Sequence, residues 1–236
     1  KFSVSRKTLF IKKYKIDINL QKKREKPVIN CGLFFYKKIY IIWFIKIMNL
    51  KKALKDSINA KKKLILLEDK INNCIDLISS TIKNNRKILI CGNGGSAADA
   101  QHLATEFLIR LRPKVNRRSF PVIALAQDAS TITACGNDIG FENIFVRNLE
   151  GLGQKGDTLI AISTSGNSKN ILKVLKFSKK MGIQSISFLG NNGGKAKNLA
   201  DIELIVKSKI TARIQESHIF LGHIIFEEVE NILIKR

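Results

Sequence analysis

His102 and Glu106, four residues apart, are the first pair in this sequence whose types and spacing suggest chemistry. Residues four apart on an α-helix point from the same face, about 40° apart around its axis. Near the end of the chain, Gln215 and His223 are eight residues apart, which is about 80° around a helix and two turns along it. If the two helices face each other, these side chains could bind a divalent metal such as Zn²⁺ or supply an acid/base pair. The spacing leaves both options open.

Each of these residues also has a plain structural explanation. A single histidine on an apolar helix face is more often a core residue than a ligand, and we expect this of His218, which lies among apolar residues. Glu106 could equally be a surface residue of its helix. The combination of the four residues, rather than any one of them, favours a site.

A glycine-rich turn precedes the helix of His102. Its sequence, "CGNGGSAAD" at residues 91–99, satisfies the dinucleotide pattern G-x-G-x-x-A through Gly92, Gly94 and Ala97. That pattern also requires an acidic residue about 20 positions later, whereas the nearest candidate, Asp128, lies more than 30 positions beyond Gly94. We therefore expect the backbone N–H groups of this turn to approach an anion or a polyol, with a plain strand-to-helix turn as the alternative.

A second turn, "STSGNS" at residues 163–168, is rich in hydroxyl groups. The hydroxyl groups belong to Ser163, Thr164, Ser165 and Ser168. Together with the N–H groups at a helix start and the neighbouring Lys169, they would form a receptor for one phosphate monoester. The structural alternative, a helix N-cap, needs only one serine. No P-loop Gly-Lys-Ser/Thr for a triphosphate accompanies the turn, so the sequence predicts a phosphate monoester here.

The pattern of apolar residues predicts the elements that position these turns. Between Leu50 and about Thr81, apolar residues recur every three to four positions, which indicates one or two amphipathic helices. Strands are predicted at residues 88–91, 120–126, 158–162, 185–189 and 202–206, and helices at 97–111, near 130, at 141–152, 168–181 and 212–234. This alternation predicts a parallel sheet covered by helices on both faces. In such sheets, ligands bind beyond the carboxyl ends of the strands.

The composition restricts the partners and the compartment. Among 236 residues, 42 Lys and Arg against 19 Asp and Glu give a net charge of +23. Basic proteins often bind nucleic acid or anionic lipid, but the excess is spread along the chain and no nucleic-acid-binding motif accompanies it, so we expect no nucleic-acid partner. The four cysteines lie far apart, without metal-finger spacing. This spacing is typical of a reduced, cytoplasmic protein.

Residues 1–47 differ from the rest of the sequence, with 13 basic and 2 acidic residues. Their longest apolar run, Ile39–Ile45, is far shorter than the roughly 20 residues that span a bilayer, and they lack a clean signal-peptide pattern. Because Met48 begins a segment that looks like an ordinary start, we expect residues 1–47 to be upstream sequence translated from a wrong start. A basic membrane-surface arm and a true membrane anchor are the weaker alternatives. Residues 48–236 are expected to form the domain, without a membrane span.

Five motifs follow one another along residues 50–236: "CGNGGSAADAQHLATEF", "GNDIGFENIF", "AISTSGNS", "NNGGK" and "TARIQESH…GH". Together they closely resemble the bacterial phosphoheptose isomerase family, which has the sugar-isomerase (SIS) fold. The resemblance implies a three-layer α/β fold, a central parallel sheet flanked by helices. It also implies a homotetramer in which N-terminal helices form a central bundle and the active sites lie at subunit interfaces.

The resemblance implies a role for particular residues of these motifs. Substrate contacts are expected at Asn93, Gly94, Gly95, Ser96, Glu106, Asn137, Asp138 and Gln215, and phosphate contacts at Ser163, Thr164, Ser165 and Ser168. His102, Glu106, Gln215 and His223 match the zinc-binding positions, with one Zn²⁺ per subunit. Ala212 stands where some relatives carry an acidic residue.

The implied reaction converts sedoheptulose 7-phosphate into D-glycero-D-manno-heptose 7-phosphate, the first step towards ADP-heptose and the lipopolysaccharide core. Moving a proton between C1 and C2 through an enediol requires a base, a proton donor and a group that stabilises negative charge. Our hypothesis makes Glu106 the base and His223 its partner. If both bind zinc, their basicity falls and the metal polarises the carbonyl instead, and the sequence does not decide between these options.

Two other functions are compatible with the same fold. A non-catalytic relative binds the bacterial replication initiator protein as a tetrameric adaptor, but it lacks equivalents of Glu106 and His223, both of which are present here. Sugar-phosphate-sensing regulatory domains usually come with an attached DNA-binding or catalytic domain, and residues 1–47 have no helix-turn-helix pattern. The sequence therefore favours the enzyme.

Overall fold

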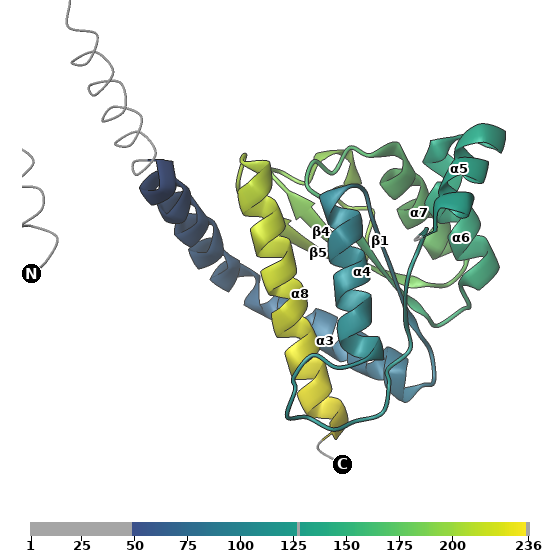
Figure 1. The fold of residues 1–236 in the computed structure, drawn as a ribbon, viewed down its shortest axis with the longest axis horizontal. Coiled ribbons are helices and arrows are strands. Elements are labelled where there is room, and N and C mark those ends of the chain that lie inside the picture. The colour runs from purple at the N-terminus through teal and green to yellow at the C-terminus, as the bar shows by residue number, and fades with distance from the viewer. Residues whose placement is uncertain (1–48, 127, 235–236) are drawn as a thin grey trace, which may run out of the picture. The chain divides into compact units, whose positions relative to one another are not determined.

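The computed structural model describes residues 49–126 and 128–234 (Figure 1). The chain divides into two units, residues 1–51 and 52–236, and the second unit holds the sheet and the helices around it. The predictions for the basic segment at residues 1–47 lie outside the described residues. Within the described ranges, no helix has both the length and the apolar character that crossing a membrane requires.

Five parallel strands form the central sheet in the order β2-β1-β3-β4-β5. The strands are β1 (Ile88–Gly92), β2 (Val122–Ala124), β3 (Thr158–Ser163), β4 (Gln184–Gly190) and β5 (Ile202–Val206). All residues of β1 and β3 are buried, which explains why these strands are continuous apolar runs in the sequence. The chain leaves β1 for β2 on one side and returns to β3 on the other, so the strand order reverses between β1 and β3. Ligands of open parallel sheets bind at this switch point.

Helices cover both faces of the sheet, which confirms the predicted three-layer α/β fold (Figure 1). One core lies under α3 (Glu68–Lys83), α4 (Gly95–Leu108) and α8 (Thr211–Ile234). The other lies under α5 (Ala129–Asp138), α6 (Ile144–Leu152) and α7 (Lys169–Lys180). Three short 3₁₀ helices complete the domain: η1 (Lys63–Leu67), η2 (Phe141–Asn143) and η3 (Gly194–Ala196). A further helix occupies residues 49–62, before η1.

Strand β2 and helix α4 differ from their predicted bounds. Strand β2 spans three residues rather than 120–126. Pro121 before it has no N–H group to donate, and the last bond to β1 is the one from the N–H of Leu125 to the Ile90 carbonyl. Helix α4 begins at Gly95 instead of residue 97, directly after Gly94, whose φ of 55° suits glycine. It also ends at Leu108 instead of residue 111, before the basic segment that contains Pro113.

Helices α4 and α8 approach each other closely. A Cβ atom at Gly222 of α8 would lie 2.6 Å from Cδ2 of Leu103 on α4, so only glycine fits there without displacing the leucine. One turn further along, the rings of Phe107 and Phe226 stack with their centroids 3.7 Å apart. This close packing brings polar residues on the two helices within reach of one another.

Candidate active site

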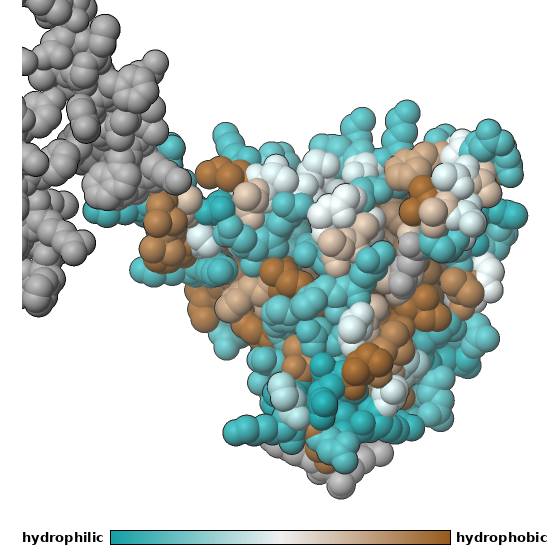
Figure 2. Space-filling model, viewed as in Figure 1, coloured by the Kyte–Doolittle hydropathy of each residue, from teal (hydrophilic) through white to brown (hydrophobic). Residues whose placement is uncertain are grey.

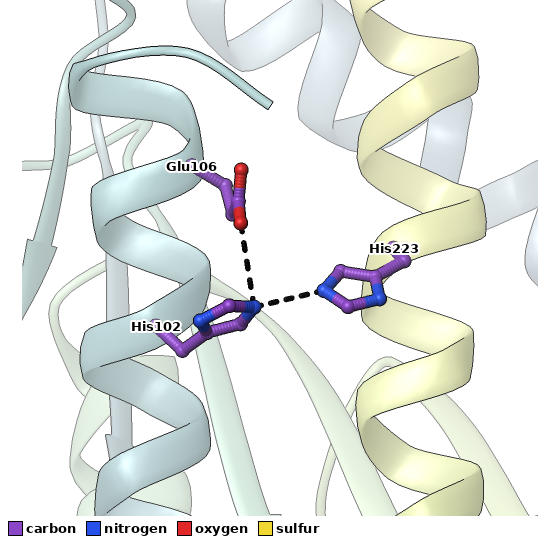
Figure 3. A group of neighbouring side chains, drawn as sticks. All are labelled: His102, Glu106 and His223. Carbon is purple, nitrogen blue, oxygen red and sulfur yellow. Dashed lines mark hydrogen bonds and ion pairs between the residues drawn. The ribbon is translucent and has the colours of Figure 1, made fainter. Parts of the chain in front are cut away.

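Helices α4 and α8 bring three of the predicted site residues together (Figure 3). Nε2 of His102 lies 2.9 Å from Nε2 of His223 and 3.3 Å from Oε1 of Glu106. One ligand atom from each of the three residues lies within 4.8 Å of the others. Glu106 and His223 are partly buried, whereas His102 is exposed. The group is therefore preformed and open to a ligand.

The chemistry of this group fits a zinc ion. Imidazole nitrogen and carboxylate oxygen are common zinc ligands, and catalytic zinc sites use three protein ligands and leave one position for water or substrate. Both histidines present Nε2 to the same point, as binding of one ion requires. Without an ion, one Nε2 atom must donate and the other accept in this contact.

Gln215, the fourth predicted ligand, contacts the first turn of α4. Its Nε2 packs on the first turn of α4, where a Cβ atom at Gly95 would lie only 2.3 Å away. His102 is seven residues further along α4, which is about 10 Å at 1.5 Å per residue. The structure thus places Gln215 beside the glycine-rich turn, and its role as a ligand or substrate contact stays a prediction.

The residues on either side of Gln215 have structural partners. Arg213 donates from Nη1 to the carbonyl oxygen of Ala53 at 2.6 Å, and it also forms an ion pair with Glu216. Ser57 in turn donates to Glu216 at 2.8 Å. In the "RIQE" motif, Arg213 and Glu216 therefore attach the helix at residues 49–62 to α8.

His218 is a core residue, as expected from the sequence. It is fully buried, and its Nε2 lies 3.1 Å from the carbonyl oxygen of Leu189 on β4. Burial lowers the pKa of its ring to about 4, and the contact with Leu189 opposes this only in part. His218 is therefore neutral at physiological pH and takes no part in the site.

The glycine-rich turn lies at the switch point, at the end of β1. Gly94 and Gly95 are exposed, whereas the side chain of Ser96 is buried. The amide of Asn93 forms two reciprocal hydrogen bonds with Asn170, at 2.9 and 2.8 Å. Of the four substrate contacts predicted here, the structure thus leaves the two glycines most accessible and turns the Asn93 side chain towards α7.

The hydroxyl-rich turn follows β3, the strand that pairs with β1. Ser168 occupies the N-cap position of α7, but its side chain makes no capping hydrogen bond. This argues against the structural alternative, because a serine that only caps the helix would use its hydroxyl for that bond. Ser163 is buried and accepts a hydrogen bond from the N–H of Gly166, whereas Ser165 is exposed and Thr164 is partly so.

A second glycine-rich segment packs against this turn and forms hydrogen bonds with it. The backbone of Gly193 packs so closely on Gly166 that a Cβ atom there would lie 1.9 Å from the Gly193 carbonyl oxygen. The N–H of Ala196 donates to the Gly166 carbonyl at 2.8 Å, and the N–H of Lys195 donates to the side chain of Asn167 at 3.0 Å. The "NNGGK" motif therefore fixes the shape of the hydroxyl-rich turn.

Asn137 and Asp138 lie at the end of α5, where both are exposed. Their side chains are joined to each other by a hydrogen bond of 2.7 Å. In the described ranges, no hydrogen bond or ion pair connects them to His102, Glu106 or His223. Their role in substrate binding stays a prediction.

Sequence reasoning missed Asp99, which precedes His102 by three residues on α4. Its Oδ2 is buried without a hydrogen-bond partner among the described residues. Burial raises the pKa of this carboxyl group, and the nearby rings of His102 and His223 lower it. Asp99 therefore belongs to the surroundings of the histidine pair. Its spacing from His102, close to one helical turn, is the signal that could have identified it.

Asn170 and Arg117 were also missed, because neither type of residue marks a site by itself. Asn170 is the second residue of α7 and is recognisable only through its pairing with Asn93. Arg117 lies in the basic segment after α4, where it resembles its charged neighbours in the sequence. Its contacts with α4 and α8 depend on the folded chain.

The fold and the two turns at its switch point agree with a known class of protein. The family model described as SIS domain matches residues 53–190. Curated relatives point to one branch of this class: the chain is 44% identical to "Phosphoheptose isomerase" of Clostridium acetobutylicum over 187 residues, which covers 78% of this chain and 94% of the relative. It is 55% identical to the protein of that name in Nitratiruptor sp. over 144 residues, 61% of this chain and 76% of the relative.

Solved structures agree with this result. The phosphoheptose isomerase of Neisseria gonorrhoeae aligns with a TM-score of 0.71 and 37% identity, covering 76% of this chain and 97% of that one. The phosphoheptose isomerase of Francisella tularensis aligns with a TM-score of 0.75 and 34% identity, covering 79% and 98%. The chain belongs to the phosphoheptose isomerase family.

Proposed function

We propose that the protein is an isomerase that converts sedoheptulose 7-phosphate into D-glycero-D-manno-heptose 7-phosphate, the first step towards ADP-heptose. One observation carries the proposal: His102, Glu106 and His223 converge from two helices within 4.8 Å. The names of the curated relatives support the same reaction. The non-catalytic adaptor is not favoured, because that protein lacks equivalents of Glu106 and His223.

The two turns suit the phosphate end of the substrate. Because β1 and β3 pair in parallel, with Gly92 opposite Ile162, the turns that follow them lie side by side at one edge of the sheet. The free hydroxyl of Ser168 and the N–H groups at the start of α7 suit the phosphate. The exposed backbone of Gly94 and Gly95 suits the sugar hydroxyl groups. In this arrangement, the carbonyl end of the sugar extends along α4 towards His102 and Glu106.

Proton transfer is assigned to Glu106 and His223. Oε1 of Glu106 faces His102 at 3.3 Å, which leaves the second carboxylate oxygen to take the carbon-bound proton of the substrate. In the metal-free site, the Nε2–H group of the histidine pair is then available to the substrate oxygen through His223. Were Zn²⁺ bound, one per subunit, His102, Glu106 and His223 would hold it, with Gln215 as the fourth predicted ligand. The ion would then polarise the substrate carbonyl in place of this acid/base pair.

Replacement of Glu106 tests the assignment. Glu106→Gln keeps the shape of the side chain but removes the base, so we expect turnover of sedoheptulose 7-phosphate to fall at least about 100-fold. Binding of inorganic phosphate, measured by calorimetry, is expected to stay unchanged, because the hydroxyl-rich turn is separate. Full activity of the variant would refute the role of Glu106.

Metal analysis and an assay with a chelator, run on the unmodified protein, test the zinc ion. Activity that survives complete metal removal counts against a catalytic role for zinc.

The proposal includes a homotetramer with active sites at subunit interfaces. Several large apolar side chains of the N-terminal helices are exposed: Leu54, Ile58, Ile65 and Leu66. Figure 2 shows apolar surface over this part of the described chain, and contact between copies would remove it from water.

A cytoplasmic location is supported by the three cysteines of the described ranges, Cys74, Cys91 and Cys135, which are all free thiols.

A further inference from the structure

We infer that Arg117 is a positioning residue, which fixes the last turn of α4 against α8 and so holds Glu106 opposite His223. The inference rests on the proposed function, because it concerns the geometry of that site. The side chain of Arg117 is only 3% exposed, which is unusual for an arginine outside a helix or strand. Its partners are the end of α4, Glu230 of α8, and the neighbouring Arg118 and Phe120.

Arg117 completes the hydrogen bonds at the end of α4. Its Nη2 donates to the backbone carbonyl of Glu106 at 2.8 Å, and its Nη1 donates to that of Phe107 at 2.9 Å. The last four carbonyl groups of an α-helix have no partner within the helix, and Glu106 and Phe107 are among them because α4 ends at Leu108. A positive charge at this end also interacts favourably with the helix dipole. Arg117 therefore stabilises the turn that carries Glu106.

The same guanidinium group is attached to α8. Its Nε donates to Oε1 of Glu230, a residue with no exposed surface that lies seven positions, about two turns, beyond His223. The group also lies over the ring of Phe120, 4.3 Å from its centroid. A buried carboxylate without a partner is strongly destabilising, so Glu230 and Arg117 hold each other in place. One side chain thus links the end of α4 to α8.

Arg112 provides a matched control within the chain. Its Nε donates to the other oxygen of Glu230 at 2.6 Å, but its side chain is 32% exposed. Among the described contacts, its side chain reaches no carbonyl group of α4. Arg112 and Arg117 therefore share the same acidic partner and differ in whether they contact the turn of Glu106.

The experiment compares Arg117→Lys with Arg112→Lys in the full chain. Lysine keeps the charge but cannot replace the fixed fork of donors with which Arg117 reaches Glu230 and both carbonyl groups. For Arg117→Lys we expect kcat and Zn²⁺ affinity, measured by competition with a chelator, to fall about 10- to 100-fold. KM for the sugar phosphate is expected to change little, because the phosphate turn is distant. Arg112→Lys is expected to keep all three quantities within about twofold.

Several outcomes would overturn the inference. Unchanged kcat and Zn²⁺ affinity in Arg117→Lys, or equal losses in both variants, would show that contact with α4 does not matter. If Arg117→Lys does not fold, as judged by circular dichroism, Glu230→Gln replaces it: this variant keeps the shape of the side chain, and it must lower Zn²⁺ affinity more than Arg112→Lys does. If the protein without substitutions binds Zn²⁺ but does not isomerise the sugar phosphate, only the proposed function is refuted. If it neither binds Zn²⁺ nor isomerises the sugar phosphate, both proposals fail.

Discussion

Asn93 and Asn170 connect the two turns that are proposed to bind the substrate. Their amides exchange two hydrogen bonds, and Oδ1 of Asn170 also accepts the N–H of Ile171 at 2.9 Å. Asn170 is buried, so the pair is shielded from competition by water. The resemblance to the family assigned Asn93 to substrate contact, whereas its geometry indicates that it also sets the distance between the turns.

A double-mutant cycle separates these two roles. If the amides act mainly on each other, Asn93→Ala and Asn170→Ala should each raise KM for the sugar phosphate about fivefold, since a hydrogen bond contributes on the order of 1 kcal/mol. The double variant should then be no worse than either single variant, because both remove the same interaction. Steady-state kinetics measures the three values. Losses that add in the double variant would instead indicate independent contacts with the substrate.

At the scale of elements, the close approach of α4 and α8 creates the candidate site. The contact of Gly222 with Leu103 and the stacking of Phe107 on Phe226 set the separation of the helices. Periodicity predicted both helices and the faces that carry His102 and His223. It did not predict which pair of helices would be neighbours, because helix packing depends on contacts between residues more than 100 positions apart.

Gly222→Ala tests whether this separation matters. The new methyl group would overlap Leu103, which is fully buried. The control is Gly151→Ala on α6, where a Cβ atom meets nothing within 4 Å. Both changes replace a helical glycine by alanine, and overpacking should make Gly222→Ala about 1–3 kcal/mol less stable than the control. Denaturant unfolding measures the difference, and Zn²⁺ affinity should fall only in Gly222→Ala. Equal stability of the two variants would show that the helices adjust freely.

At the scale of the whole molecule, sequence patterns predicted the fold class and four of the five strands within about one residue. Continuous apolar runs such as Ile88–Cys91 predicted buried parallel strands, whereas phosphate binding by the hydroxyl-rich turn stays a prediction. The order of the strands was not predicted, because nothing in the sequence of a strand specifies its neighbours. For the same reason, the reciprocal pairing of Asn170 and the contacts of Arg117 could be recognised only in the folded chain.

His218 links the stability of the whole domain to pH. Its ring is neutral in the folded protein because burial lowers its pKa to about 4 from an ordinary 6.5. In the unfolded chain, the ring binds a proton as soon as the pH falls below about 6.5, whereas the folded protein does not. The stabilising effect is therefore complete above pH 6.5 and is lost as the pH falls towards 4. Between pH 7.5 and 5, the loss amounts to about 2 kcal/mol.

The variant His218→Gln isolates this contribution, because glutamine can still donate to the Leu189 carbonyl but does not titrate. Urea unfolding of the metal-free protein at pH 7.5 and 5, at one protein concentration, gives the change in unfolding free energy for each form. Other groups titrate equally in both, so their effects cancel in the comparison. The normal protein should lose about 2 kcal/mol more than the variant over this range. Equal losses would mean that the ring takes up its proton without unfolding the domain, and that water reaches it in the folded state.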